Sequence, residues 1–389
     1  MSESLEQSIT KYFNTRKAGI SYSSIINGKV QQPQAFGIRK SVFWPWQSAP
    51  LITTNTRFQA ASVSKPITAC AVLKLVEQGV LDLDVDINTY LGSTGWQLKV
   101  AEKNEFITDG KVPTVTLRHL LSHTAGISCH GFLGYNFKDN VPTTREILDG
   151  VKINHSKIEL AFEHGKFSYS GGGYTIVQYI LETVCQKPFD VLMKELILDP
   201  LNMKNSSYTL EKSDKEYLAN AIGTWWFPPW VFYGNLPYSL HPESAAAGLW
   251  TTPGDLILLS KALLDSYNGV PNAFFKPQAI KEFSTNQVTG ANESELFGIG
   301  WAVKNYQNNL TISHNGSNTG FKAQLIIQFS TNSAIVVMHN KEHYNLLHPV
   351  LNVLVKSCGM VIEKEYKGWE ITAQDLMSMW VEYIWDLVF

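Results

Sequence analysis

The sequence predicts an α+β fold in which strands from both ends of the chain form one sheet and the middle of the chain forms a mainly helical lobe. Two observations lead to this prediction. Short, β-rich segments bounded by turn residues lie near the N-terminus and again after about residue 296. From about 81 to 290 the chain consists mostly of helical segments and loops. We therefore expect a sheet domain made of residues 1–80 and 291–389, with a helical lobe at 81–290.

The N-terminal part of the chain contains the first expected strands. Residues 4–16 have the apolar spacing of a short amphipathic helix. A weakly alternating stretch at 19–30 follows, and it contains Asn27-Gly28, a dipeptide that favours a tight hairpin turn. A second strand is expected at about 34–39.

Helices dominate the prediction for the middle of the chain. Residues 63–78 carry apolar side chains at helical spacing and are followed by Gly79, a residue typical of helix C-terminal caps. Thr116 stands where an N-cap belongs, directly before an apolar helical run. Further helices are expected at 174–186 and 255–265.

The C-terminal part returns to strands. Four short β-rich segments are separated by turn residues: 298–303, 310–313, 323–329 and 334–339. A helix is expected at about 345–357. Large apolar side chains between Trp369 and Phe389 recur at helical spacing. We interpret them as a terminal helix docked on the core, with a dimer contact or a membrane contact as the alternative.

The composition is that of a globular protein with a large core, because 44% of the 389 residues are hydrophobic. A net charge of -2 and the absence of any basic run argue against nucleic acid or an anionic membrane as a partner. The N-terminus lacks a secretory signal, and no stretch has the roughly 18 apolar residues of a spanning helix. We therefore expect a cytoplasmic protein whose four scattered cysteines stay reduced.

The first chemical candidate is Ser62-Val63-Ser64-Lys65, at the start of a predicted helix. Residues three apart share a helix face, so Lys65 lies beside Ser62. A serine becomes a nucleophile when a neighbouring base takes its proton, and burial together with the helix dipole lowers a lysine pKa toward that role. The backbone N–H of Ser62 can stabilise an oxyanion at the same helix start. Ser-x-x-Lys alone is a weak signal, because a serine here is usually only a cap.

Two further segments strengthen that signal. Residues 167–174 read Phe-Ser-Tyr-Ser-Gly-Gly-Gly-Tyr, a turn-rich loop before a helix, in which Tyr169 can act as general base or acid if a neighbouring cation lowers its pKa. A structural turn is the alternative, and a phosphate loop is excluded because no Gly-Lys-Ser/Thr follows. Residues 313–320 join two predicted strands; His314 can line a cleft there, and the backbone N–H of Ser317 can supply a second oxyanion donor.

These segments resemble the three ordered motifs of serine β-lactamases and penicillin-binding proteins. The likeness is greatest to the class C β-lactamase-like branch, which also contains family VIII esterases and D-amino-acid peptidases and amidases. The resemblance covers about residues 10–355. Seven segments carry it: 62–65, 169–171, 314–316, 119–127, 200–203, 248–256 and 297–301.

The resemblance implies both a fold and a mechanism. The fold is an antiparallel sheet flanked by helices and built from both chain ends, plus a mainly helical lobe. In the mechanism, Ser62 attacks a carbonyl and forms an acyl-enzyme, while Lys65 and Tyr169 move the proton. The N–H groups of Ser62 and Ser317 hold the oxyanion, and water then releases the acid.

The sequence departs from the β-lactamase pattern at two positions. The third motif usually begins with a lysine that helps to hold the substrate carboxylate, but here it is His314-Asn315-Gly316, and a histidine is largely neutral at pH 7 unless its pKa shifts. The second motif often ends in an asparagine that contacts substrate, but here it ends in Gly171. Both departures disfavour efficient β-lactamase action and suit small esters or amides.

No metal or cofactor is expected. His119 and His123 are four residues apart and His130 is near, but His-Glu-x-x-His is absent and no carboxylate stands between them. We interpret that segment as a structural turn. The absence of Gly-x-Ser-x-Gly around any serine argues against an α/β-hydrolase.

An aromatic segment at residues 225–233 reads Trp-Trp-Phe-Pro-Pro-Trp-Val-Phe-Tyr. Trp226 and Trp230 on such a loop can form the wall of an apolar substrate pocket, and Tyr135 is a weaker candidate of the same kind. Lobe packing or a subunit contact is the alternative.

The sequence thus predicts a serine hydrolase that cleaves an ester or amide bond, with a β-lactam as a further candidate and β-lactamase activity weak or absent, through an acyl-enzyme on Ser62. Its partner is a small-molecule ester, amide or peptide, with a homo-oligomer as a further possibility. One alternative is a D-stereospecific peptidase or amidase. Another is a non-turnover penicillin-binding or scaffold protein on the same fold.

Overall fold

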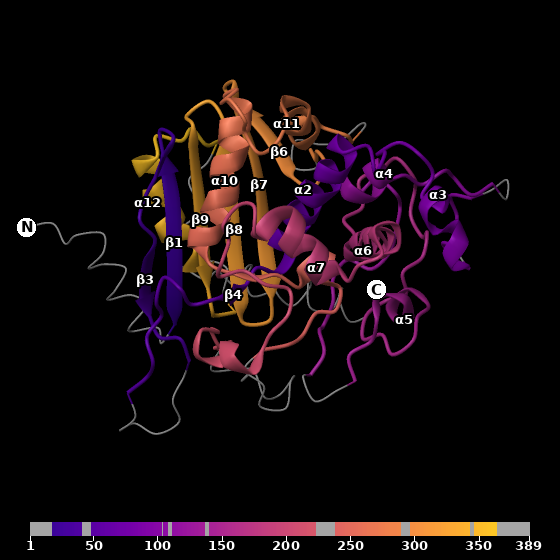
Figure 1. Cartoon of the computed structure of the whole chain (residues 1–389), viewed down its shortest axis with the longest axis horizontal. Coiled ribbons are helices and arrows are strands. Elements are labelled where there is room, and N and C mark those ends of the chain that lie inside the picture. The colour runs from indigo at the N-terminus through magenta and orange to yellow at the C-terminus, as the bar shows by residue number, and fades with distance from the viewer. Residues whose placement is uncertain are drawn as a thin grey trace, which may run out of the picture.

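One antiparallel sheet built from both ends of the chain organises the fold (Figure 1). The structure, a computed structural model, describes residues 18–40, 48–102, 104–107, 111–136, 140–222, 238–288, 296–342 and 346–363. Within these residues the strand order is β2-β1-β9-β8-β7-β6, with β3 also paired to β1. Its strands are β1 (Gly19–Ile26), β2 (Lys29–Val30), β3 (Gln34–Gly37), β6 (Ala302–Tyr306), β7 (Asn309–Asn318), β8 (Phe321–Gln328) and β9 (Ser333–His339).

The N-terminal and C-terminal parts of the chain meet in this sheet, where β1 pairs antiparallel with β9. Figure 1 shows the indigo β1 beside the last strand of the sequence. Asn340 secures the junction: its side chain accepts the Gly19 N–H at 2.7 Å and donates to the carbonyls of Ile38 and Arg39 at 3.1 and 3.0 Å. The predicted hairpin turn at Asn27-Gly28 is confirmed, with φ of 47° and 78°, the positive values that a tight hairpin turn of this type requires.

The sheet is covered on both faces, which explains why its inner strands are apolar throughout. Side chains alternate across a strand, so Ile335 and Val337 of β9 face one way and Val336 the other. The first pair packs against α12 (His348–Ser357), in a smaller core with Leu351. The opposite face belongs to the main core, which it shares with the helices.

The helices gather mostly on one side of the sheet, where Figure 1 shows α3, α4, α5 and α6 together. The α-helices are α2 (Ser64–Glu77), α3 (Asn88–Leu91), α4 (Leu117–Leu121), α5 (Thr144–Leu148), α6 (Gly171–Cys185), α7 (Phe189–Met193), α9 (Ser244–Ala247), α10 (Pro253–Tyr267) and α11 (Pro277–Ser284). Short 3-10 turns are η1 (Ala61–Val63), η2 (Gly92–Thr94) and η4 (Lys212–Glu216), η3 (Lys194–Leu198) is a π-helical turn, and β4 (Phe58–Gln59) pairs with β5 (Trp250–Thr251).

The α+β prediction is confirmed, with differences in detail. β7 continues through residues 314–318, which the sequence placed in a connection, because these residues pair with β8 in unbroken register. α6 begins three residues early at Gly171, because Ser170 caps it by accepting the Gly173 N–H at 3.0 Å. The division at residues 81 and 290 stays a prediction, and α10, from the middle range, packs on β9 and β1.

Two expected helices, at 4–16 and between Trp369 and Phe389, lie outside the described residues. Within the described part of the chain, none of the helices combines the length and apolar character needed to span a bilayer.

Candidate active site

Ser62 stands in the 3-10 turn η1, immediately before α2. Its neighbours Ala61 and Val63 are fully buried, whereas Ser62 is partly exposed. Ala61 has φ of 48°, a left-handed conformation that is unusual for a residue with a Cβ and that concentrates at functional sites. The turn therefore exposes the Ser62 hydroxyl to solvent while the residues on either side of it are buried.

Lys65 lies one helical step away, and its Nζ is 3.1 Å from Ser62 Oγ and 3.1 Å from the carbonyl oxygen of Ala246. The side chain is buried, with 1% of its surface exposed. Burial lowers the pKa of Lys65 to about 7. A neutral amine has two hydrogens and one lone pair, so it can donate to Ala246 while it accepts the Ser62 proton.

Tyr169 completes the group, because its side chain lies beside that of Ser62, which influences the Tyr169 pKa. Lys65 Nζ lies 4.9 Å from the centre of the Tyr169 ring. From the sequence, Tyr169 could act as a base on the condition that a neighbouring cation lowers its pKa. That condition is not met: burial raises the pKa, and the neighbouring Ser62 only partly opposes this. The reason is that the lysine expected to act as a cation is itself buried and readily neutral. Tyr169 is therefore a phenol that can donate a proton.

Two histidines that the sequence analysis interpreted as parts of a structural turn contact Tyr169. The rings of His123 and His130 lie 4.2 and 4.8 Å from the Tyr169 ring, centre to centre. His123 Nδ1 accepts the Ser170 N–H at 3.0 Å, so the ring hydrogen must sit on Nε2. The sequence pointed to the 119–127 segment only through its resemblance to the family. The contact with Tyr169 could not be predicted, because the two segments are far apart in the chain.

His314 lies on β7 with its ring 6.1 Å from that of Tyr169. Its Nδ1 is 2.7 Å from the carbonyl oxygen of Asn315, and because a carbonyl only accepts, Nδ1 carries the hydrogen. Burial and the nearby Lys65 lower the pKa of His314 to about 3. His314 is thus neutral at pH 7, and its Nε2 is a buried lone pair with no hydrogen-bond donor among the described residues.

The third motif lies on a strand that is partly free at one edge. β6 pairs with β7 only as far as Ser313, so within the described residues no strand covers 314–318 on that side. Gly316 packs on η1 so closely that an added Cβ would be 2.1 Å from the Ala60 carbonyl oxygen. This contact places the backbone of Ser317 beside the Ser62 turn. The Ser317 hydroxyl accepts from Lys322 Nζ at 2.9 Å, and Asn315 is exposed.

The remaining predicted substrate contacts fall elsewhere or outside the described residues. Gly171 is a packing position, since a Cβ there would be 2.6 Å from the Phe132 ring. Tyr135 is buried, and burial followed by the charge of Glu243 raises its pKa. Trp226 and Trp230 lie outside the described residues.

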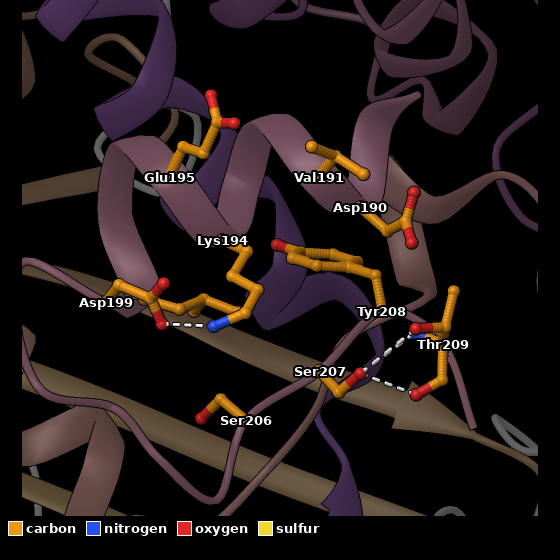
Figure 2. Close-up of a pocket in the computed structure, with 10 residues that line it drawn as sticks. Asp190, Val191, Lys194, Glu195, Asp199, Ser206, Ser207, Tyr208 and Thr209 are labelled. Carbon is orange, nitrogen blue, oxygen red and sulfur yellow. Dashed lines mark hydrogen bonds and ion pairs between the residues drawn. The ribbon is translucent and has the colours of Figure 1, made fainter. Parts of the chain in front are cut away.

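A cavity of about 330 Å³ between α7, η3 and residues 206–209 shares no residue with this group (Figure 2). Figure 2 shows Lys194 paired with Asp199 and the Ser207 hydroxyl bonded to Thr209. Lys194 pairs with Asp199 inside the cavity and Glu195 pairs with Lys187 outside it, both at exposed positions, so we assign no chemistry to the cavity. Among the described residues, no cluster of three or more histidine, cysteine or acidic side chains is arranged to hold a metal ion.

Comparison with known proteins places this geometry in context. A family model described as Beta-lactamase matches residues 9–357. Protein flp of Staphylococcus aureus (strain MRSA252) is 23% identical over 327 residues, covering 83% of this chain and 59% of that protein. The chain therefore spans about three fifths of the length of that curated relative.

Solved structures share the fold. A penicillin-binding protein homologue from Pyrococcus abyssi, described as octameric, has a TM-score of 0.70 at 24% identity and covers 93% of this chain and 78% of its own. A structure described as a β-lactamase/D-alanine carboxypeptidase from Yersinia pestis, complexed with citrate, has a TM-score of 0.66 at 19% identity, covering 92% and 100%. These identities support a common fold and carry no substrate to this chain.

Proposed function

This chain belongs to the Beta-lactamase family, and from that premise we propose that it is a serine hydrolase that cleaves an ester or amide bond through an acyl-enzyme on Ser62. One observation carries the proposal: the Ser62 hydroxyl is hydrogen-bonded to a buried amine and lies beside a phenol. A buried lysine whose pKa lies near 7 is a base matched to neutral pH. A serine that merely caps a helix would need neither partner.

Acylation follows from this arrangement. Ser62 Oγ attacks the substrate carbonyl carbon while its proton passes to Lys65 Nζ. The resulting oxyanion is stabilised by the backbone N–H groups of Ser62 and Ser317. As the bond from carbonyl carbon to the leaving group breaks, Tyr169 donates its proton to the leaving oxygen or nitrogen and is reprotonated by Lys65.

Deacylation reverses these roles. A water oxygen attacks the acyl carbon and gives its proton to the Tyr169–Lys65 pair, the bond from that carbon to Ser62 Oγ breaks, and Ser62 recovers its proton. Every group returns to its starting state, so neither a metal nor a redox cofactor enters the cycle.

The preferred substrate follows from His314. Its neutral ring offers a lone pair at Nε2, which attracts a donor such as an amide N–H or a hydroxyl and repels a carboxylate. We therefore propose an uncharged ester or amide rather than a penicillin-like acid. The homo-oligomer stays a prediction, alongside the Pyrococcus abyssi homologue that is described as octameric.

The experiment is a time course of p-nitrophenyl acetate, p-nitrophenyl butyrate and nitrocefin hydrolysis, with intact-mass detection of the acyl adduct. Ser62→Ala removes the nucleophile and should lower ester turnover by at least about a thousandfold, with no adduct. Ser284→Ala is the matched control, because among the described residues Ser284 Oγ bonds to the Ile280 carbonyl within α11 and to no residue of the Ser62 site. Wild-type rates in Ser62→Ala would refute the assignment.

Two other outcomes identify the alternatives. Turnover of D-amino-acid amides without ester turnover would indicate the D-stereospecific peptidase or amidase. A stable Ser62 adduct without turnover would indicate the non-turnover penicillin-binding reading.

A further inference from the structure

Close to the Ser62 site, three side chains from separate segments meet: Cys129, His155 and Glu243. Cys129 Sγ is 3.3 Å from His155 Nδ1, and His155 Nε2 is 3.2 Å from Glu243 Oε1. All three are buried: Cys129 is 3% exposed, and the side chains of His155 and Glu243 are 2% and 0% exposed. A thiol is activated as a nucleophile when an imidazole lies beside it and a carboxylate contacts the other side of that imidazole. Because the imidazole lies between the other two, they cannot converge on one metal ion.

The surroundings of His155 determine its protonation. Nδ1 is also 2.6 Å from the carbonyl oxygen of Ser156, which only accepts, so Nδ1 carries a hydrogen. Nε2 faces the Glu243 carboxylate in an ion pair, and neither Glu243 oxygen has a hydrogen bond among the described residues. A carboxyl group 3.2 Å from a buried imidazole favours the protonated form of that ring. Both ring nitrogens therefore carry hydrogens, and His155 is an imidazolium.

The pKa of His155 agrees with this protonation. Burial by itself lowers that pKa, but the adjacent Cys129 and Glu243 side chains outweigh burial and raise it to about 10. The positive charge of an imidazolium 3.3 Å from a sulfur stabilises the thiolate, which is the reactive form of cysteine. Cys129 also has φ of 66°, a strained value for a residue with a side chain.

The cluster is joined to the Ser62 site on two sides. The carbonyl of Cys129 accepts the Gly172 N–H at 3.0 Å, and that of His130 accepts the Gly171 N–H at 3.0 Å, so this segment holds the loop that follows Tyr169. Glu243 directly precedes α9, the helix whose Ala246 carbonyl receives Lys65 Nζ. A displacement of Cys129 or Glu243 would therefore move the supports of both Tyr169 and Lys65.

There is no spare room around Cys129. A Cβ added at Gly172 would be 3.2 Å from Cys129 Cβ and 2.7 Å from the Ser128 carbonyl oxygen. An atom attached to Sγ must displace this packing. Access requires a small reagent, because only 3% of the surface of Cys129 is exposed.

We propose that Cys129, His155 and Glu243 form a thiol site that peroxides and small alkylating electrophiles modify, and that this modification inactivates the Ser62 site. With a peroxide, the thiolate sulfur attacks one oxygen, an S–O bond forms and the O–O bond breaks. The leaving hydroxide takes a proton from His155 and becomes water, while the sulfur is oxidised by two electrons and the peroxide is reduced. With an iodoacetamide, an S–C bond forms and iodide leaves.

The first test is modification of the folded, full-length protein with hydrogen peroxide or iodoacetamide, followed by peptide mass measurement at each cysteine. Cys70, Cys185 and Cys358 are internal controls, because burial raises the pKa of each thiol. Cys129 should react at least about tenfold faster than any of them. His155→Gln should slow Cys129 modification about tenfold by removing the positive charge. An unreactive Cys129, or an unchanged rate in His155→Gln, would overturn the thiol site.

The second test concerns inactivation and rests on the proposed function. Loss of p-nitrophenyl butyrate turnover should follow the fraction of Cys129 modified. Cys129→Ser should hydrolyse the ester and resist peroxide, whereas the control Cys185→Ser should remain sensitive. Modification without loss of activity, or a Cys129→Ser variant as sensitive as wild type, would overturn the link to Ser62. If no ester is turned over at all, the proposed function fails while the labelling test still decides the thiol site.

Discussion

At the scale of single residues, burial converts ordinary side chains into a matched set. Lys65 is enclosed by a serine hydroxyl, a carbonyl oxygen and the rings of Tyr169 and Tyr174, whose centres lie 4.9 and 5.7 Å from Nζ. None of these neighbours carries the negative charge that would hold a lysine protonated, so desolvation lowers its pKa. The same burial keeps Tyr169 a phenol and His314 neutral. The surroundings of each side chain therefore set its protonation state: Lys65 is the base, Tyr169 the acid and His314 the neutral substrate contact.

The pH dependence of acylation tests the role of Lys65. Only the neutral amine accepts the Ser62 proton, so kcat/KM for p-nitrophenyl butyrate should rise with pH up to about 7 and then level off. Below pH 7 it should fall about tenfold per pH unit. Lys65→Arg, whose guanidinium stays protonated, should be inactive throughout. A flat profile between pH 5 and 9 would show that Lys65 is not the base.

Substitution at His314 tests the substrate preference. His314→Lys replaces a neutral acceptor with a cation, so turnover of nitrocefin, which carries a carboxylate, should rise relative to p-nitrophenyl butyrate by about tenfold. His314→Gln is the neutral control and should leave that ratio near the wild-type value. If the lysine variant lowered both rates equally, His314 would not select between the substrates.

At the scale of elements, the site depends on three segments meeting at close range. η1 carries Ser62, the start of α6 follows Tyr169, and the free half of β7 carries His314 and Ser317. Glycines permit these approaches: Gly316 lies against the Ala60 carbonyl, and Gly172 lies against that of Ser128. Each contact is between backbones, so its geometry allows little adjustment.

Gly316→Ala tests the approach of β7 to η1. The new methyl group would clash with the Ala60 carbonyl, so β7 must move away from Ser62 and the oxyanion donors lose their spacing. Ester turnover should fall by about a hundredfold or more, as expected for a displacement of about 1 Å at a reacting centre. Gly92→Ala is the control, because nothing lies within 4 Å of its added Cβ and its φ is -55°. Full activity in Gly316→Ala would show that the close approach of β7 to η1 is not needed for catalysis.

At the scale of the whole molecule, the sheet unites the two ends of the chain and thereby fixes the motifs relative to one another. β7 carries the third motif. It is joined through β8 and β9 to β1, which belongs to the N-terminal segment that leads to Ser62. Asn340 is fully buried at this junction and bonds to three backbone groups of the N-terminal segment. Stability of the junction therefore supports both the fold and the site.

Asn340→Ala tests this junction. The change leaves the Gly19 N–H and the Ile38 and Arg39 carbonyls without the amide, and unfolding free energy should fall by about 2–4 kcal/mol. Urea denaturation monitored by circular dichroism measures the loss. Asn88→Ala, at an exposed position of α3, is the control and should stay within about 0.5 kcal/mol of wild type. An unchanged midpoint in Asn340→Ala would mean that the two ends associate without it.

The sequence by itself determined the α+β class, the hairpin at Asn27-Gly28 and the three segments that carry Ser62, Tyr169 and His314. These are local signals: hydrophobic period, turn chemistry and spacing within one helix need only neighbouring residues. The tertiary structure alone decided the direction of the Tyr169 pKa, the tautomer of His314 and the meeting of Cys129, His155 and Glu243. Burial and contacts between residues far apart in the chain set these properties, and no local pattern encodes them.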